Sequence, residues 1–166
     1  TKWAYAEGDP LTMHIEMRDD VTFHNGDKMT MEDIKFSFFD RLSDEAHPID
    51  FAGVWGAFKE FEVTSPTSAT IRFNYPMATV QEWWNFLGSY IVPKKYYTEV
   101  GHDEFIKNPV GSGPYKLVDY QRGSRIVLEA YDNYWGGAPK IKSVTFEVIT
   151  DAPARVAAVQ SGNADV

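Results

Sequence analysis

The chain has 166 residues, 43% of them hydrophobic and 15% aromatic, which provides enough apolar material for a folded core and excludes a disordered chain. Its formal net charge of −8 argues against binding to nucleic acid or to anionic membrane surfaces, because both depend on clustered Lys and Arg. Cysteine is absent, which excludes disulfides and thiol chemistry, and no apolar run reaches the roughly 18 residues of a membrane span. The chain starts at Thr1 and stops where a new strand pattern begins, so we expect a processed or excised piece of a longer protein.

The first predicted elements are a strand and a helix. Residues 11–17 alternate apolar with polar side chains, which predicts a half-buried strand with His14 on the solvent side. Residues 21–23 predict a second short strand, and residues 24–27 have turn chemistry, with Gly26 free to take a positive φ. Thr30 and Asp33 have the spacing of a capping box and predict a helix start. Its apolar face comprises Met31, Ile34, Phe38 and Leu42. We therefore interpret the acidic pair in the first turn as capping rather than acid–base catalysis.

The middle of the chain combines an irregular loop, a hairpin and short helices. Residues 43–56 have no period, so Trp55 is either a plug over the core or a platform for a ligand. Residues 58–63 and 70–74 predict a hairpin, and residues 80–87 a short helix whose Trp83 and Trp84 face the core. Residues 89–93 are expected to be extended, and two helices follow at 94–100 and 102–107.

Residues 108–115 (NPVGSGPY) are the stretch around which the rest is organised. Prolines fix φ near both ends, and two glycines between them permit conformations that other residues avoid. A phosphate cradle is the alternative, but it requires a Gly-Lys-Ser/Thr sequence or a third glycine opening a helix, whereas here a strand pattern follows. We predict a rigid crossing between two parts of the chain.

The C-terminal part predicts three strands and a helix. The strands cover residues 114–120, 125–130 and 144–149, and an aromatic-rich loop occupies residues 131–139. Asp151 caps a last helix that runs to Gln160.

No catalytic or metal-binding constellation emerges from the pattern. The four histidines have no metal-ligand spacing, and Ser112 lies in a turn followed by a strand, the wrong context for a nucleophile. We expect no enzyme activity, no metal and no cofactor.

Four motifs in one order resemble those of a known family. Residues 23–37 (FHNGDKMTMEDIKFS), 108–115 (NPVGSGPY), 131–139 (YDNYWGGAP) and 151–165 resemble the signatures of family 5 bacterial extracellular solute-binding proteins. These are the oligopeptide, dipeptide and nickel receptors of ABC importers. Met31 departs from the family pattern, where Ala is usual.

The resemblance implies an α+β mixed, periplasmic-binding-protein-like class II fold that is only partial here. Residues 1–108 correspond to the subdomain of the first lobe and residues 109–166 to part of the first lobe, and the second lobe is absent. It also implies capture of a peptide or similar small solute for permease subunits of an ABC transporter. The location would be periplasmic or extracytoplasmic, as a cell-surface lipoprotein in a Gram-positive organism, with any lipid anchor outside this chain.

The resemblance also suggests ligand-binding residues by position: Trp55, Ser89 and Tyr90. Tyr90 and Trp55 would pack on a ligand side chain, and Ser89 would hydrogen-bond it. A nickel chelate, an oligosaccharide or an opine remains an alternative ligand. Two other classes stay open: a carboxylate-dependent hydrolase, which needs a carboxylate pair in one cleft, and an interaction module that self-associates through exposed apolar surface.

Overall fold

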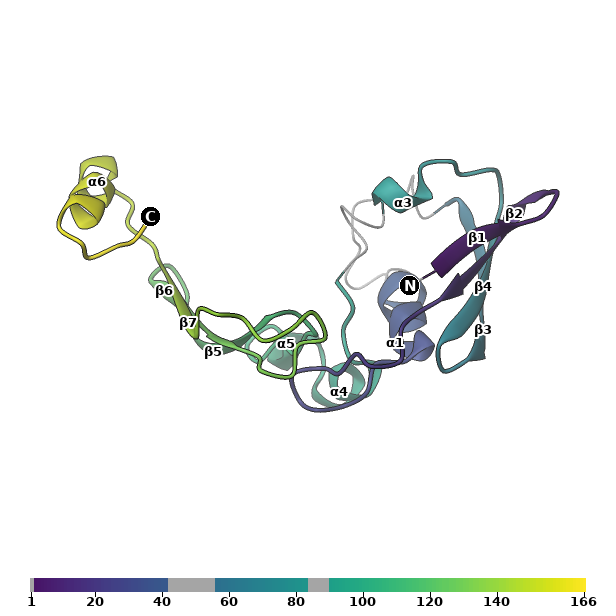
Figure 1. Ribbon diagram of the computed structural model, residues 1–166, viewed down its shortest axis with the longest axis horizontal. Helices are drawn as coiled ribbons and strands as arrows, with labels where there is room; N and C mark the ends of the chain where they lie inside the picture. Colours follow the sequence, from purple (N-terminus) through teal and green to yellow (C-terminus); the bar gives the residue numbers. More distant parts are fainter. Residues whose placement is uncertain (1, 42–55, 84–89) are drawn as a thin grey trace.

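The computed structural model describes residues 2–41, 56–83 and 90–166, which form an elongated molecule with a sheet in each half (Figure 1). The first sheet has the order β1-β2-β4-β3, and the second has the order β5-β6-β7. All neighbouring strands are antiparallel. No helix within the described ranges is long and apolar enough to span a bilayer.

The first sheet is built from two hairpins. Its strands are β1 (Lys2–Ala6), β2 (Asp9–Glu16), β3 (Phe58–Ser65) and β4 (Ser68–Phe73). The predicted strand at 11–17 and hairpin at 58–74 are confirmed, and His14 is exposed as expected. β1 was not predicted, and the expected strand at 21–23 is wrong, because only a bridge between Thr22 and Lys28 forms there.

The helix after Thr30 covers one face of this sheet. It consists of α1 (Met31–Lys35), which continues as a π-helical turn, η1 (Phe36–Asp40). Of its predicted apolar face, Met31 is buried, Ile34 and Phe38 are half-buried, and Leu42 lies outside the described residues. The Phe39 ring lies edge-on to Phe58 and Phe61 of β3, with centroids 5.9 and 5.8 Å apart. One core cluster results, and all of its buried members lie between Met13 and Val80.

Short helices and the crossing connect the two halves. They are α3 (Val80–Trp83), α4 (Lys94–Val100) and α5 (His102–Phe105), and Gly101 between the last two has φ +78°. The helix predicted at 94–100 is confirmed, as is a shorter form of the one predicted at 102–107.

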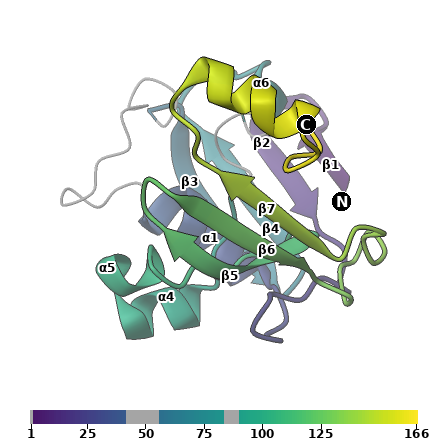
Figure 2. The same ribbon diagram turned by 90° about the vertical axis from the view of Figure 1, so that its left-hand side faces the viewer.

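The second half contains β5 (Tyr115–Gln121), β6 (Arg125–Ala130), β7 (Ser143–Glu147) and α6 (Ala152–Gln160), all close to their predicted positions. Asp151 caps α6 as predicted, with its carboxylate accepting the Ala154 N–H at 2.9 Å. α6 lies beyond the end of the three-stranded sheet (Figures 1 and 2). Among the described residues after Phe105, only Tyr131 is buried.

Candidate functional site

The crossing at residues 108–115 is held by the loop of residues 21–29, which we call the His24 loop. The His24 backbone N–H donates to the carbonyl of Gly111 at 2.8 Å. Nε2 of its ring lies 3.0 Å from the Gly113 carbonyl, and the Gly111 N–H donates to Nδ1 at 3.4 Å. The loop itself is closed by a turn at Gly26, whose φ of +88° matches the prediction. Backbone groups and one imidazole ring thus join two segments that are almost 90 residues apart in the sequence.

Tyr131, which follows β6, makes a second connection to the same loop. Its hydroxyl donates to the carbonyl of Phe23 at 2.9 Å. Because that hydroxyl has a single hydrogen, the contact with the Thr22 hydroxyl at 2.8 Å must have Thr22 as the donor. The Tyr131 ring also meets the His24 ring edge-on, with centroids 5.1 Å apart. The His24 loop therefore binds both the crossing and the second half of the chain.

A third connection fixes the extended segment before α4. The Ser37 hydroxyl donates to the carbonyl of Asp33 at 2.7 Å and accepts the Val92 N–H at 3.0 Å. The Asp33 carboxylate accepts the N–H of Thr30 at 2.8 Å, as predicted for the cap, and also the N–H of Lys94 at 2.9 Å. Asp33 thus anchors the segment that carries Tyr90, in addition to capping α1.

The crossing and the extended segment that these connections fix both line a pocket of about 470 Å³, which we call the aromatic pocket. Its walls come from the extended segment, α5, the crossing, β5 and the loop after β6. The rings that line it belong to Tyr90, Phe105, Tyr115, Tyr134 and Trp135, and His24 completes the wall. None of its described lining residues carries a formal charge at neutral pH if His24 is neutral. Such an apolar concavity with few polar groups is typical of a site for a small organic molecule.

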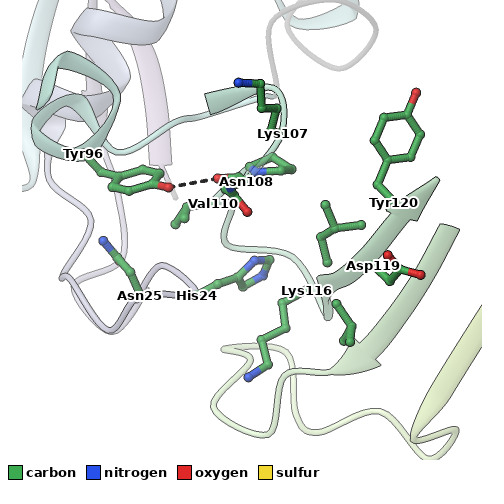
Figure 3. Close-up of a pocket in the computed structure, with 12 residues that line it drawn as sticks. His24, Asn25, Tyr96, Lys107, Asn108, Val110, Lys116, Asp119 and Tyr120 are labelled. Atoms are coloured by element: carbon green, nitrogen blue, oxygen red, sulfur yellow. Dashed lines mark hydrogen bonds between the residues drawn. The ribbon is translucent and has the colours of Figure 1, made fainter. Parts of the chain in front are cut away.

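A second hollow of about 450 Å³, the polar pocket, shares His24, Pro109 and Val110 with the aromatic pocket (Figure 3). Its charged lining residues are each paired with another side chain: Lys107 with Glu104 at 3.1 Å, Lys116 with Glu129 at 2.7 Å and Asp119 with Arg125 at 3.0 Å. The contact with Glu129 raises the pKa of Lys116 and keeps it charged. Because these charges are already paired, we expect the polar pocket to bind an ionic ligand more weakly than its composition suggests.

The chemistry available at the crossing favours binding. Burial lowers the pKa of His24, and both ring nitrogens are engaged by backbone groups, so the ring is not free to act as a base for Ser112. Within the described part of the chain, no three His, Asp or Glu residues gather as metal ligands would.

The predicted ligand residues are only partly described. Trp55 and Ser89 lie outside the described residues, as do the side chains of Trp83 and Trp84. Tyr90 lines the aromatic pocket with its side chain 72% exposed.

Sequence reasoning missed the other four rings of the pocket: Phe105, Tyr115, Tyr134 and Trp135. The available signal was the density of aromatic residues at 131–139, which we interpreted as a loop motif without assigning a site to it.

Comparisons with known proteins agree with this architecture. The oligopeptide-binding protein AppA of Bacillus subtilis is 30% identical over 162 residues, covering 92% of this chain and 29% of AppA. The dipeptide-binding protein of Escherichia coli is 28% identical, covering 99% of this chain and 34% of that protein. Among solved structures, MoaA from A. tumefaciens R10 in complex with mannopinic acid superposes with a TM-score of 0.90 at 29% identity, covering 99% of this chain and 33% of MoaA.

The chain therefore spans about a third of the length of these relatives. Its fold is the matching part of the class II fold of substrate-binding proteins, as expected. The family model for the middle region of these proteins matches residues 1–166. The chain belongs to the bacterial extracellular solute-binding proteins, family 5.

Proposed function

We propose that this chain is part of the substrate-binding component of an ABC importer, and that the aromatic pocket forms one wall of its solute site. The observation that carries the proposal is the pocket itself, where rings from segments far apart in sequence converge on an uncharged surface. Such a surface binds the apolar parts of a ligand by burial and stacking, and leaves the ligand's charges to be recognised elsewhere.

The solute that we propose is a peptide or a similar small molecule. The relative from B. subtilis is named an oligopeptide-binding protein and the one from E. coli a dipeptide-binding protein. The crossing lines the pocket with Gly111, Ser112 and Gly113. The Ser112 hydroxyl and N–H have no hydrogen-bond partner among the described residues, so they are available to a peptide carbonyl. Trp55, Ser89 and Tyr90 are the individual residues that we propose as ligand contacts.

The proposed organisation follows the two sheets. Residues 1–108 form the subdomain of the first lobe, residues 109–166 contribute part of the first lobe, and a second lobe would close over the pocket. The chain acts by binding rather than by catalysis, since the ring of His24 is occupied by backbone contacts. Permease subunits of the transporter are the partners, and the location is periplasmic, or the cell surface as a lipoprotein in a Gram-positive organism.

The test is native mass spectrometry on the longest natural form of the protein that contains residues 1–166, purified without added ligand. We expect a discrete excess of mass that disappears on denaturation and fragments as a peptide. Detection of an opine, a sugar or a metal chelate instead would leave the binding role and identify another class of solute. A clean mass, together with no heat on calorimetric titration with a mixed di- to nonapeptide library, would overturn the proposal.

A matched pair of variants tests the location of the site. Tyr90→Ala should weaken peptide binding about three- to tenfold, because a stacked ring contributes on the order of 1 kcal/mol beyond its area. Tyr120→Ala removes a half-exposed ring that lies outside the aromatic pocket and should leave affinity unchanged. Equal effects of the two substitutions would contradict the assignment of the pocket.

A further inference from the structure

The contacts of His24 define one protonation state of its ring. The Gly113 carbonyl can only accept, so Nε2, 3.0 Å away, must carry a hydrogen. The Gly111 N–H can only donate, so Nδ1, 3.4 Å away, must present its lone pair. Both contacts are satisfied together only by the neutral Nε2–H tautomer. A second proton would have to enter at Nδ1, where it would face the Gly111 N–H.

The surroundings of the ring favour the neutral form. Burial is the main cause that lowers the pKa of His24, and the nearby charge of Lys116 acts in the same direction, whereas the bond to Gly113 opposes them. The ring also packs edge-on against the aromatic ring of Tyr131.

The charged side chains of the segments around His24 are Asp27 and Lys28 of its own loop and three side chains of the polar pocket. On its own loop, Asp27 is bound by the amide of Asn25 at 2.8 Å. The charged side chains that share the polar pocket with His24 are the paired Lys107, Lys116 and Asp119 described above. Among the described residues, no carboxylate therefore contacts the ring to stabilise an imidazolium.

We propose that His24 is a positioning residue, a latch whose ring holds both Gly111 and Gly113 only as the neutral Nε2–H tautomer, and that protonation at Nδ1 breaks the bond to the Gly111 N–H and loosens the crossing there. Gly111 and Gly113, which the latch holds, also line the aromatic pocket, so the latch sets the position of that wall. The latch would hold the crossing whether or not a solute occupies the pocket.

The direction of the pH dependence follows from linkage. Because the pKa of His24 is lower in the folded chain than its ordinary value of 6.5, the unfolded chain takes up the proton first. The stabilisation is complete above about pH 6.5 and is lost as the pH falls below that value toward the folded-state pKa. Carboxylates with ordinary pKa values near 4 titrate well below this onset, so the two effects separate.

The decisive experiment is nitrogen-15 NMR of the histidine rings between pH 8 and 5, combined with hydrogen exchange of the Gly111 amide. We expect His24 to show the Nε2–H tautomer and a pKa below 6.5. The protection factor of Gly111, corrected for intrinsic exchange, should fall about three- to tenfold as the ring is protonated, which corresponds to the loss of one hydrogen bond. The Nδ1–H tautomer, or a pKa at or above 6.5, would overturn the proposal.

Two variants separate the latch from general acid sensitivity. His24→Asn keeps a short polar side chain that does not titrate, so the protection of Gly111 should become independent of pH between 8 and 5. His14→Gln replaces an exposed histidine on β2 and should retain the wild-type response of Gly111. A wild-type response in H24N would show that another group titrates and would refute the latch. If H24N fails to fold, the tautomer and pKa of the wild-type ring still decide the question.

Discussion

The two sheets share one pattern of alternation but differ in what covers their apolar faces. In the first sheet, Phe61 of β3 is 4% exposed, because α1 and η1 pack over it. In the second sheet, Leu117, Leu128 and Val144 are paired across one face, and so are Tyr120, Ile126 and Phe146. The irregular register between Leu117 and Asp119 puts Tyr120 on the same face as Leu117. Phe146 is nevertheless 56% exposed.

This difference separates two properties that a strand pattern does not distinguish. Alternation determines which side of a strand is apolar, whereas the exposed fraction depends on whether another element lies over it. Within the described residues, α1 and η1 supply that cover for the first sheet, and no helix supplies it for the second. We therefore expect the first half to carry most of the stability of the chain.

The largest expected effect compares two phenylalanines, one in each sheet. Phe61→Ala should lower the free energy of unfolding by about 3–5 kcal/mol, because it leaves a cavity in the core. Phe146→Ala should cost less than about 1 kcal/mol, since its side chain is already half in water. Urea denaturation followed by circular dichroism measures both. Equal losses would contradict the comparison and would indicate that the second face is covered in solution, for example by self-association.

A smaller effect is expected at Asp33, which binds the extended segment to the first half. Asp33→Ala should cost about 2–3 kcal/mol, because it removes the cap and leaves the Lys94 N–H without its acceptor. The control is Glu32→Gln, which removes only an exposed ion pair with Lys94 and should cost about 0–1 kcal/mol. The same denaturation assay applies, and similar values for the two variants would disprove the anchoring role.

The connection between the halves is tested at Tyr131. Tyr131→Phe deletes the hydroxyl that donates to the Phe23 carbonyl and accepts from the Thr22 hydroxyl. It should cost about 1–2 kcal/mol, because two hydrogen bonds are lost, although the Phe23 carbonyl keeps the Gly26 N–H at 2.9 Å. Tyr120→Phe removes a hydroxyl from a half-exposed ring and should stay within about 0.5 kcal/mol. Thermal melts of both variants give the comparison. If Y131F has the melting temperature of the wild type, the stability of the chain does not depend on this hydroxyl.

The smallest effect concerns an exposed ion pair in the second half. The contact with Lys142 lowers the pKa of Asp132 below its ordinary value of 3.8. Its stabilisation is therefore present above that value and is lost as the pH falls through the folded-state pKa. In Asp132→Asn and in Lys142→Gln, the free energy of unfolding should fall slightly less steeply with decreasing pH, and to the same extent in both. Denaturation at several pH values between 5 and 2 measures this slope. An unchanged slope in both variants would show that this pair contributes nothing to stability.

Local signals explain how much of the fold could be predicted from the sequence. The Thr30–Asp33 cap, the alternation of residues 11–17 and the Asp151 cap each act within a few residues, and each was confirmed. β1 was missed because it is an edge strand that forms only by pairing with β2, and its own sequence carries little signal.

The candidate site was less accessible from sequence. His24 was placed in a turn, but its partners Gly111 and Gly113 are almost 90 residues away, and no periodicity reports such a contact. The four motifs identified the family that the comparisons confirm, yet they did not show that Tyr134 and Trp135 share a pocket with Tyr90.

Hydrogen exchange followed by mass spectrometry, on the whole chain at neutral pH, tests the difference between the halves most directly. We predict that the amides of β2, β4 and α1 exchange at least about 100-fold more slowly than those of β6 and β7, because local opening is easiest where little apolar surface is buried. Equal protection in the two sheets would contradict the account.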